Sequence, residues 1–344
     1  MRLGLVGYGT GGQHFHAPFI EVVEGIELVG IVARAQDKVA AAKADFPDIP
    51  VFDSLTSMIK SIHLDAVTIT TPPNTRRALV LEAIEAGLHV VADKPFAPNA
   101  ADALEMANAA KQKGVLLSVF HNRRFDTDLV TLRKTLQSGK LGQVWRLNSR
   151  FDLDEPVTLE AGPEGGLLRD LGSHVVDQAM YLLGPVISVN ANMDEIDLPE
   201  GRTNASFSIT LNHESGAHSH VSASKVNRVI AKEFLIYAEK GSYHSLATDV
   251  QAQAIFAGKR PIDDLAGWGY QDEAHWATLN TDAGHERVPS EQGRYHDYYT
   301  LFAKAVKEGS EPPVPAEQAV QVLKVLDAAM QSAMTNQVIH LTKD

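Results

Sequence analysis

Cysteine is absent from the 344 residues of this chain. Without a thiol the protein has no disulfide, no cysteine nucleophile and no thiolate metal site. No run of about 18 apolar residues occurs, so the sequence predicts no transmembrane helix. The N-terminus also lacks the long apolar segment and the small-residue cleavage site of a signal peptide, and we therefore expect a cytoplasmic protein.

Positive charge is scarce, because 31 Lys and Arg stand against 43 Asp and Glu and the formal net charge is -12. Nucleic-acid binders need clustered Lys and Arg to contact phosphates, so this balance argues against that class. Any anionic ligand must be held by a local positive site. The composition is otherwise ordinary for a globular protein, and a chain of this length is expected to form two domains.

A glycine-rich motif opens the chain. Gly7, Gly9 and Gly12 have the G-x-G-x-x-G spacing, directly after a short apolar run that is typical of a strand. In this motif Gly7 permits the tight turn, Gly9 lets the backbone approach a pyrophosphate, and Gly12 lets the following helix pack on the strand. The helix N-terminus then offers N–H groups to the phosphates. The motif predicts dinucleotide binding, although similar loops merely connect elements in other proteins or serve methyltransferases.

Strands and helices alternate through the first third of the chain. Strand-like runs cover residues 26–32, 65–71, 88–92 and 115–120, and helix-like stretches cover residues 36–46, 75–86 and 100–113. This alternation predicts an α/β Rossmann domain with a doubly wound parallel sheet over residues 1–121. Ligands of such sheets lie at the carboxyl ends of the strands, where Gly7, Thr71 and Lys94 are found.

After about residue 121 the pattern changes to longer strands with fewer helices between them. Strand-like runs cover residues 143–151, 205–211, 217–225 and 232–238, and a long amphipathic helix is expected over residues 316–333. Alternation of Phe207, Ile209 and Leu211 indicates one buried sheet face. We predict an α+β domain over residues 122–344 with a large, mostly antiparallel open sheet. Its uncovered face is expected to form a homodimer or homotetramer.

Several separated motifs resemble those of the Gfo/Idh/MocA family of sugar and polyol oxidoreductases, over nearly the whole chain. They are the glycine-rich motif, the Thr71-Pro72-Pro73 end of a strand, the Asp93-Lys94-Pro95 triplet and the segment LRDLGSH at residues 168–174. The stretch VFHNRRFD at residues 119–126 resembles the subgroup that contains NADP-dependent scyllo-inositol dehydrogenases. Two positions depart from the family pattern, since Asp93 replaces a common Glu and Arg76 a common His.

The resemblance implies an NAD(P)-dependent dehydrogenase that moves a hydride between a nicotinamide and an inositol, a sugar or a related polyol. The main alternative is a regulator of the same fold that binds the dinucleotide and a sugar without turnover. Another nucleotide-dependent enzyme, such as a methyltransferase, would leave Lys94 without a role.

Three residues are candidates for the chemistry. Lys94 follows a strand and is held by Pro95, and an ammonium there stabilises the charge that develops on an alcohol oxygen as hydride departs. The alternative is a surface lysine. Asp170 and His174 are four residues apart in a region of helical periodicity, residues 166–183, and spacing alone favours a structural helix pair. The resemblance instead implies that His174 is a general base, with Asp170 as its partner or as a ligand of a second hydroxyl.

Cofactor preference is predicted from the end of the second strand. An acidic residue there would bind the ribose 2'-hydroxyl and repel a 2'-phosphate, but this chain has Ala33-Arg34. A guanidinium holds a phosphate bidentately, so we expect NADP in preference to NAD. The alternatives are a solvated Arg34 or one stacked on adenine. The expected cofactor contacts are Gly7, Tyr8, Gly9, Thr10, Gly12, Arg34, Thr71, Pro72, Asn74, Asp93, Lys94 and Asn122.

The expected substrate contacts are Lys94, Asn122, Asp152, Asp170, His174 and Tyr295. Asn122 follows the last strand of the first domain and Asp152 lies at a strand end. Tyr295 begins a late helix, where packing is the common alternative for a tyrosine. Arg124 and Asp126, close to Asn122, are interpreted as a structural ion pair.

Two groups of histidines remain. His218 and His220 share one strand face and His213 stands across a predicted turn, but zinc sites usually add further ligands, and we expect a polar sheet face and no metal. His14 and His16 lie beside the phosphate loop and are expected either to approach the cofactor or to pack the helix.

Overall fold

The chain forms two compact units in the structure, a computed structural model that describes residues 1–162 and 165–342. The first unit comprises Met1–Asn122, Ala252–Trp268 and Arg294–Val320, and the second comprises Arg123–Gln251, Gly269–Gly293 and Gln321–Asp344. The sequence predicts a single boundary after residue 121, whereas the first unit also includes two later segments. Because these segments lie far along the chain from the Rossmann pattern, periodicity alone does not assign them to it.

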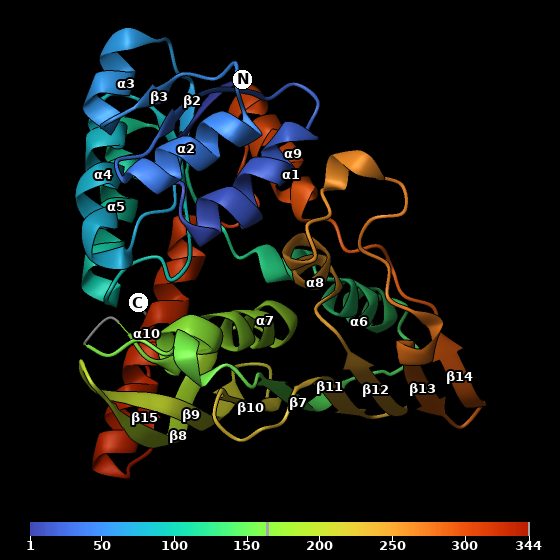
Figure 1. The fold of residues 1–344 in the computed structure, drawn as a ribbon. Helices are drawn as coiled ribbons and strands as arrows, with labels where there is room; N and C mark the ends of the chain where they lie inside the picture. The colour runs from blue at the N-terminus through green and yellow to red at the C-terminus, as the bar shows by residue number, and fades with distance from the viewer. Residues whose placement is uncertain (163–164, 343–344) are drawn as a thin grey trace. The chain divides into compact units, whose positions relative to one another are not determined.

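The first unit is built on a six-stranded sheet in the order β3-β2-β1-β4-β5-β6 (Figure 1). Its strands are β1 (Arg2–Val6), β2 (Glu27–Val32), β3 (Val51–Phe52), β4 (Ala66–Ile69), β5 (His89–Ala92) and β6 (Leu117–Val119). Every pairing is parallel, which confirms the predicted doubly wound sheet. The strand order reverses between β1 and β4, and ligands of such sheets bind at this switch point.

Helices follow the strands of the first unit. They are η1 (Gly11–His16), α1 (Ala17–Glu21), α2 (Gln36–Asp45), α3 (Leu55–Ser61), α4 (Pro73–Glu85), α5 (Ala100–Lys113), η5 (Pro261–Asp263) and α9 (Tyr295–Glu308), while α8 (Val250–Phe256) and α10 (Ala316–Thr335) belong partly to each unit. Local sequence explains the bounds of α5, because the Asn99 side chain accepts from the Asp102 N–H (2.9 Å) and Gly114 ends the helix with a φ of 73°.

The second unit contains a nine-stranded sheet in the order β14-β13-β12-β11-β7-β10-β9-β8-β15 (Figure 1). Its strands are β7 (Val144–Asp152), β8 (Val186–Leu198), β9 (Gly201–His213), β10 (His218–Ser224), β11 (Ala231–Ala238), β12 (Gly241–Ala247), β13 (Ala277–Thr281), β14 (Gly284–Val288) and β15 (Ile339–His340). Only β7 and β10 pair in parallel, and the other pairings are antiparallel. The predicted large, mostly antiparallel sheet is therefore confirmed.

Helices cover one face of this second sheet. The helices and helical turns are η2 (Asn122–Phe125), α6 (Thr127–Gln137), η3 (Pro156–Thr158), η4 (Leu168–Gly172), α7 (Ser173–Leu183) and η6 (Glu273–His275), together with most of α10. The first residue of η2, Asn122, is the last of the first segment of the first unit. Phe207 and Leu211 are buried on the covered face, as their alternation predicts. On the other face the side chains of Tyr237 and Leu246 are 37% and 56% exposed. The solvent-facing side of the sheet therefore carries exposed apolar side chains among polar ones.

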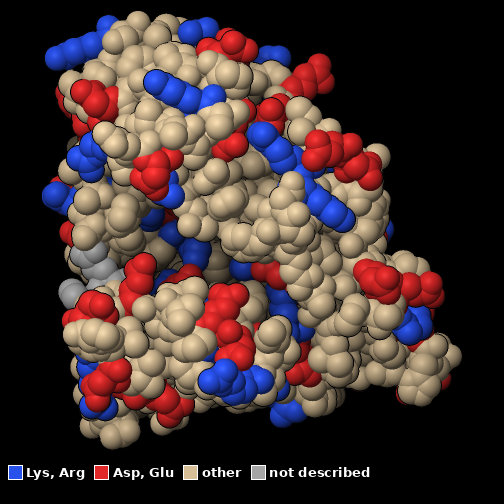
Figure 2. Space-filling model, viewed as in Figure 1, with Lys and Arg blue, Asp and Glu red and all other residues tan. Residues whose placement is uncertain are grey.

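Charged side chains of both signs are interspersed over the face shown in Figure 2. Within the two described ranges, no helix is both long enough and apolar enough to cross a membrane.

Candidate functional site

The loop after β1 has the geometry that a dinucleotide needs. Gly7 has a φ of 102°, in the region that favours glycine. A Cβ on Gly12 would lie 2.2 Å from the Gly7 carbonyl oxygen, so only glycine lets η1 start this close to the strand. A Cβ on Gly9, in contrast, would meet no heavy atom of the described residues within 4 Å. Packing does not explain Gly9, whereas close approach of a pyrophosphate does.

Tyr8 and Gln13 hold this loop against α2. The Tyr8 hydroxyl donates to Asp45 Oδ2 (2.8 Å), and Gln13 Nε2 donates to the same oxygen (3.1 Å). Burial, with Asp45 beside it, raises the pKa of Tyr8 far above its usual value, so the phenol stays protonated and keeps donating. The ring packs in a core cluster with Leu5, whereas Thr10 is exposed on the loop.

The turn between β4 and α4 lies at the same sheet edge. It contains Thr71 and Pro72, and Asn74 follows in the first turn of α4; all three are expected cofactor contacts. Thr70, one residue earlier, donates from its hydroxyl to the Gly7 carbonyl oxygen (3.0 Å). The side chain of Thr70 thus ties this turn to the glycine loop, across the switch point of the sheet.

Asp93 and Lys94 follow β5 at this edge. The Lys94 N–H donates to Asp93 Oδ1 (2.8 Å), and His16 Nε2 lies 3.4 Å from the same oxygen. Burial alone would raise the pKa of Asp93, but the adjacent His16, Arg76 and Lys94 outweigh it, and the pKa is lowered. Asp93 therefore stays ionised and anchors the backbone of Lys94. His16 is fully buried, with Nδ1 2.5 Å from the Tyr299 hydroxyl, so it packs beneath the loop.

Arg34 is the second residue after β2 and follows Ala33. Its side chain is exposed, and its guanidinium makes no ion pair or hydrogen bond with the described part of the chain. The neighbouring cation Lys38, in the first turn of α2, is paired with Asp37 (3.4 Å). An unpaired cation is therefore available where the adenosine ribose of a dinucleotide lies on this fold.

Asp170 and His174 belong to the second unit, where η4 leads into α7. The region of predicted helical periodicity, residues 166–183, is helical from residue 167, and its first part, Leu168–Gly172, is a π-helix that leads into α7. Asp170 Oδ2 accepts from Lys225 Nζ (2.8 Å), and the same ammonium donates to Thr158 Oγ1 (2.8 Å). The Asp170 side chain is 40% exposed, whereas Lys225 and His174 are buried. Lys225 is a partner of Asp170 that the sequence analysis missed.

Asp152 ends β7, as the sequence predicts. Its carboxylate is buried and accepts from Arg150 Nε (2.5 Å) and Asn227 Nδ2 (3.5 Å). Asn122 is also buried and is the last residue of the first segment of the first unit.

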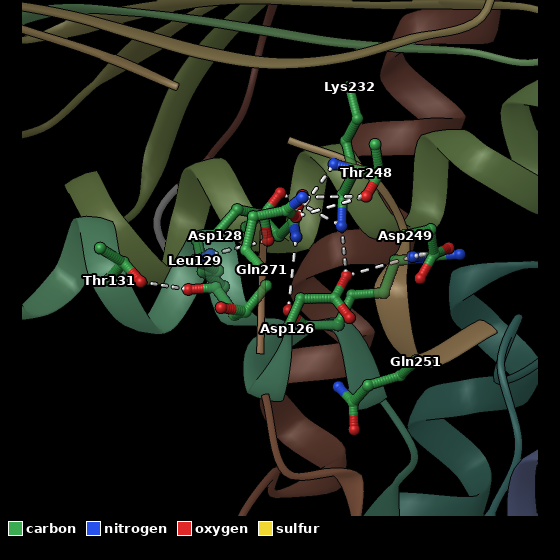
Figure 3. A network of polar contacts seen from close by, with 12 residues as sticks. Asp126, Asp128, Leu129, Thr131, Lys232, Thr248, Asp249, Gln251 and Gln271 are labelled. Carbon is green, nitrogen blue, oxygen red and sulfur yellow. Dashed lines mark hydrogen bonds and ion pairs between the residues drawn. The ribbon is translucent and has the colours of Figure 1, made fainter. Parts of the chain in front are cut away.

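Arg124 and Asp126 take part in buried ion pairs of the second unit. Arg124 Nη2 binds Asp177 Oδ1 (2.6 Å), and Asp126 Oδ2 binds Lys232 Nζ (2.6 Å), so both residues have the structural kind of role that the sequence analysis favoured. Figure 3 shows the Lys232 ammonium directed toward Asp126, and Asp128 lies 3.1 Å from it. Burial opposes the charge of Lys232, but the two carboxylates outweigh it and raise its pKa. These pairs brace α6 against β11.

Tyr295 begins α9, which belongs to the first unit. Its side chain is fully buried, and its ring packs edge-on against Phe19 with 5.2 Å between the centroids. This placement favours the packing role that the sequence left open.

The three histidines of the β9–β10 hairpin do not share one face. His213 is buried, with Nδ1 2.8 Å from the Gly184 carbonyl oxygen and Nε2 2.9 Å from Ser219 Oγ. His218 and His220 alternate with the buried Ser219 and point to the opposite face. Elsewhere on the chain, the His14 ring packs near Phe256, with 5.7 Å between the centroids.

Comparison with known proteins identifies the family. Residues 1–121 match the model of the Gfo/Idh/MocA oxidoreductase family with an NAD-binding Rossmann fold, and residues 129–244 match the Gfo/Idh/MocA C-terminal domain. The chain is 30% identical to IolW of Bacillus subtilis, a scyllo-inositol 2-dehydrogenase (NADP(+)), over 99% of this chain and 96% of that protein. It is 33% identical to the oxidoreductase YdgJ of Escherichia coli, over 97% and 96%.

The fold of the chain is also similar to that of solved oxidoreductase structures. The solved structure of yvaA from Bacillus subtilis superposes with a TM-score of 0.91 at 30% identity, over 99% of each chain. The glycine loop, the strand order and the full-length similarity agree, and this chain belongs to the Gfo/Idh/MocA family of NAD(P)-binding oxidoreductases.

Proposed function

We propose that this protein is an NAD(P)-dependent dehydrogenase that oxidises a secondary hydroxyl of an inositol, a sugar or a related polyol. The observation that carries the proposal is the position of Lys94 after β5, at the same sheet edge as the glycine loop. The similarity to IolW, whose name gives scyllo-inositol as substrate, supports the polyol class.

The proposed roles follow from the charge of each group. A bound nicotinamide supplies the hydride acceptor. The Lys94 ammonium stabilises negative charge on the reacting oxygen and so lowers the pKa of that hydroxyl. His174 accepts the hydroxyl proton as general base. Asp170, held by Lys225, accepts a hydrogen bond from a neighbouring hydroxyl, and Asp152 and Asn122 complete the polar lining in this proposal.

A panel of polyols and aldoses tests the activity. We expect stoichiometric reduction of the nicotinamide, followed by its absorbance, with at least one cyclic polyol among scyllo-inositol, myo-inositol and the common aldoses. One reduced nicotinamide should form for each carbonyl produced. Binding of the dinucleotide without turnover across the panel would contradict the proposal and favour the non-catalytic regulator.

We further propose a preference for NADP over NAD, because Arg34 is exposed and makes no pairing with the described residues, and because Ala33-Arg34 stand after β2 where an acidic residue would bind the ribose 2'-hydroxyl. Arg34→Ala is expected to lower kcat/KM with NADP by about tenfold and to leave kcat/KM with NAD almost unchanged, as loss of one charge-assisted phosphate contact predicts. Steady-state kinetics with both cofactors measure this difference. Lys60→Ala, at an exposed lysine of α3, is the control. A strong NAD preference that Arg34→Ala leaves unchanged would refute the proposed role.

A homodimer or homotetramer is proposed to form through the open face of the nine-stranded sheet. The Arg146 guanidinium lies 4.0 Å from the centroid of the Tyr237 ring on this face, next to exposed apolar side chains such as Leu246. Exposed aromatic and apolar side chains with a stacked guanidinium are typical of protein interfaces.

A further inference from the structure

Arg76 makes an unusual set of contacts within the first unit. It lies in the first turns of α4 and is only 2% exposed. Its Nη2 donates to the Thr71 carbonyl oxygen (2.5 Å), and its Nη1 donates to the Asp93 carbonyl oxygen (2.6 Å) and to the Pro95 carbonyl oxygen. One guanidinium therefore joins the turn after β4 to the turn after β5.

The contacts of Arg76 bracket Lys94. Two of its acceptors are the carbonyl groups of Asp93 and Pro95, the residues immediately before and after that lysine. From the other side, the Lys94 N–H is held by the Asp93 carboxylate (2.8 Å). The backbone of Lys94 is thus fixed through both neighbours and through its own N–H.

Burying the charged guanidinium of Arg76 costs free energy, so its burial without a structural purpose is a poor explanation of this residue. Burial lowers the pKa of Arg76 to about 10, against the opposing influence of Asp93. The next residue, Arg77, offers a direct contrast, because its side chain is 42% exposed and forms an ordinary ion pair with Glu105 (2.6 Å). The planar guanidinium has several N–H donors in fixed directions, and it therefore reaches three carbonyl oxygens in two turns. Neither the ammonium of a lysine nor the imidazole of a histidine has that geometry.

We propose that Arg76 is a positioning residue for the reaction, which sets the place of Lys94 by tying the turn at residues 93–95 to the turn at residues 71–73. This inference rests on the proposed function, in which Lys94 acts on the substrate oxygen. Arg76 itself touches neither substrate nor cofactor in this scheme. Its effect is transmitted through the backbone of the turn, and a displacement of about 1 Å at a reacting group is enough to slow turnover up to about 100-fold.

The test compares Arg76→Lys with Arg77→Lys on the full-length protein. For Arg76→Lys we expect kcat to fall about tenfold while the Kd for the dinucleotide changes less than about threefold, because none of the bonds that Arg76 makes with the described residues reaches the glycine loop. Arg77→Lys should leave both values at the level of the unmodified protein. In Arg76→Gly, millimolar guanidinium chloride should restore part of kcat, which general loosening of the fold would not allow.

A second comparison separates this inference from the function on which it rests. If Arg76 acts through Lys94, adding Arg76→Lys to Lys94→Ala should lower kcat no further. Hydrogen exchange in peptides covering residues 70–75 and 89–98 should also be faster in Arg76→Lys, with or without any turnover.

Failure of the proposed function and failure of the positioning role of Arg76 give different results. Absence of polyol oxidation by the unmodified protein would refute the proposed function, and the exchange measurement would still decide whether Arg76 fixes the turns. The positioning role would be overturned if Lys94→Ala is inactive while Arg76→Lys keeps both its kcat and its hydrogen-exchange rates unchanged. Additive losses in the double variant would overturn it as well.

Discussion

Replacing Lys94 by alanine is expected to lower kcat/KM for the polyol at least about 150-fold, equivalent to about 3 kcal/mol of transition-state stabilisation. The reason is that the ammonium interacts with charge that develops on the substrate oxygen only as hydride leaves, so its loss affects the reaction more than binding. The Kd for the dinucleotide, measured by fluorescence titration, should change little. Lys113→Ala, at a half-exposed lysine near Glu85, serves as the matched control.

His174→Ala is expected to cause a loss of similar size, because the hydroxyl proton then has no positioned acceptor. The pH profile distinguishes the two variants. In His174→Ala the rate should rise with pH as hydroxide replaces the missing base, whereas Lys94→Ala should not recover in this way. Near-normal turnover in both variants would remove these residues from the mechanism.

Replacing Gly9 by alanine is expected to weaken dinucleotide binding about 30-fold, or about 2 kcal/mol, while leaving the melting temperature unchanged. The reason is that a Cβ at this position meets no heavy atom of the described chain within 4 Å, so the folded protein tolerates it. The same methyl group would occupy the space of the pyrophosphate. Calorimetric titration with NADP and a thermal scan measure the two effects separately.

Gly87→Ala is the converse control for Gly9→Ala. Gly87 follows α4 with a φ of 79°, and a Cβ there has open space among the described residues. An alanine at this φ should destabilise the fold by about 1 kcal/mol without weakening NADP binding. If Gly9→Ala instead behaved like Gly87→Ala, with lower stability and intact binding, the loop after β1 would not hold the pyrophosphate.

The sequence predicts most of the first unit because its signals are local. Glycine spacing, apolar runs of four to six residues and helix caps such as Asn99 act within a few positions of one another. The strand β3 has two residues, too few for any periodicity, and the sequence analysis predicts neither this strand nor the seven-residue helix α3. The packing of α9 on the first unit depends on contacts such as that between Tyr299 and His16, 283 positions apart, which a periodicity argument does not detect.

The site is predictable to the extent that each residue lies at the end of a strand. Gly7, Thr71 and Lys94 fall at one sheet edge, since the carboxyl ends of parallel strands meet there. Partners from distant positions were not predicted, and Lys225 is the clearest case because it is 55 positions from Asp170 along the chain. Arg76 carried one signal, its departure from the histidine common in similar sequences, but its three acceptors are backbone carbonyl groups that sequence patterns do not identify.

The most direct test of the central claim is a crystal structure of the complex with NADP and a bound cyclic polyol. The proposal requires the dinucleotide on the loop at residues 7–12, with Lys94 Nζ and a ring nitrogen of His174 each within about 3 Å of one hydroxyl whose carbon faces the nicotinamide. A complex in which either nitrogen turns away from that hydroxyl, or in which the loop holds no dinucleotide, would contradict it.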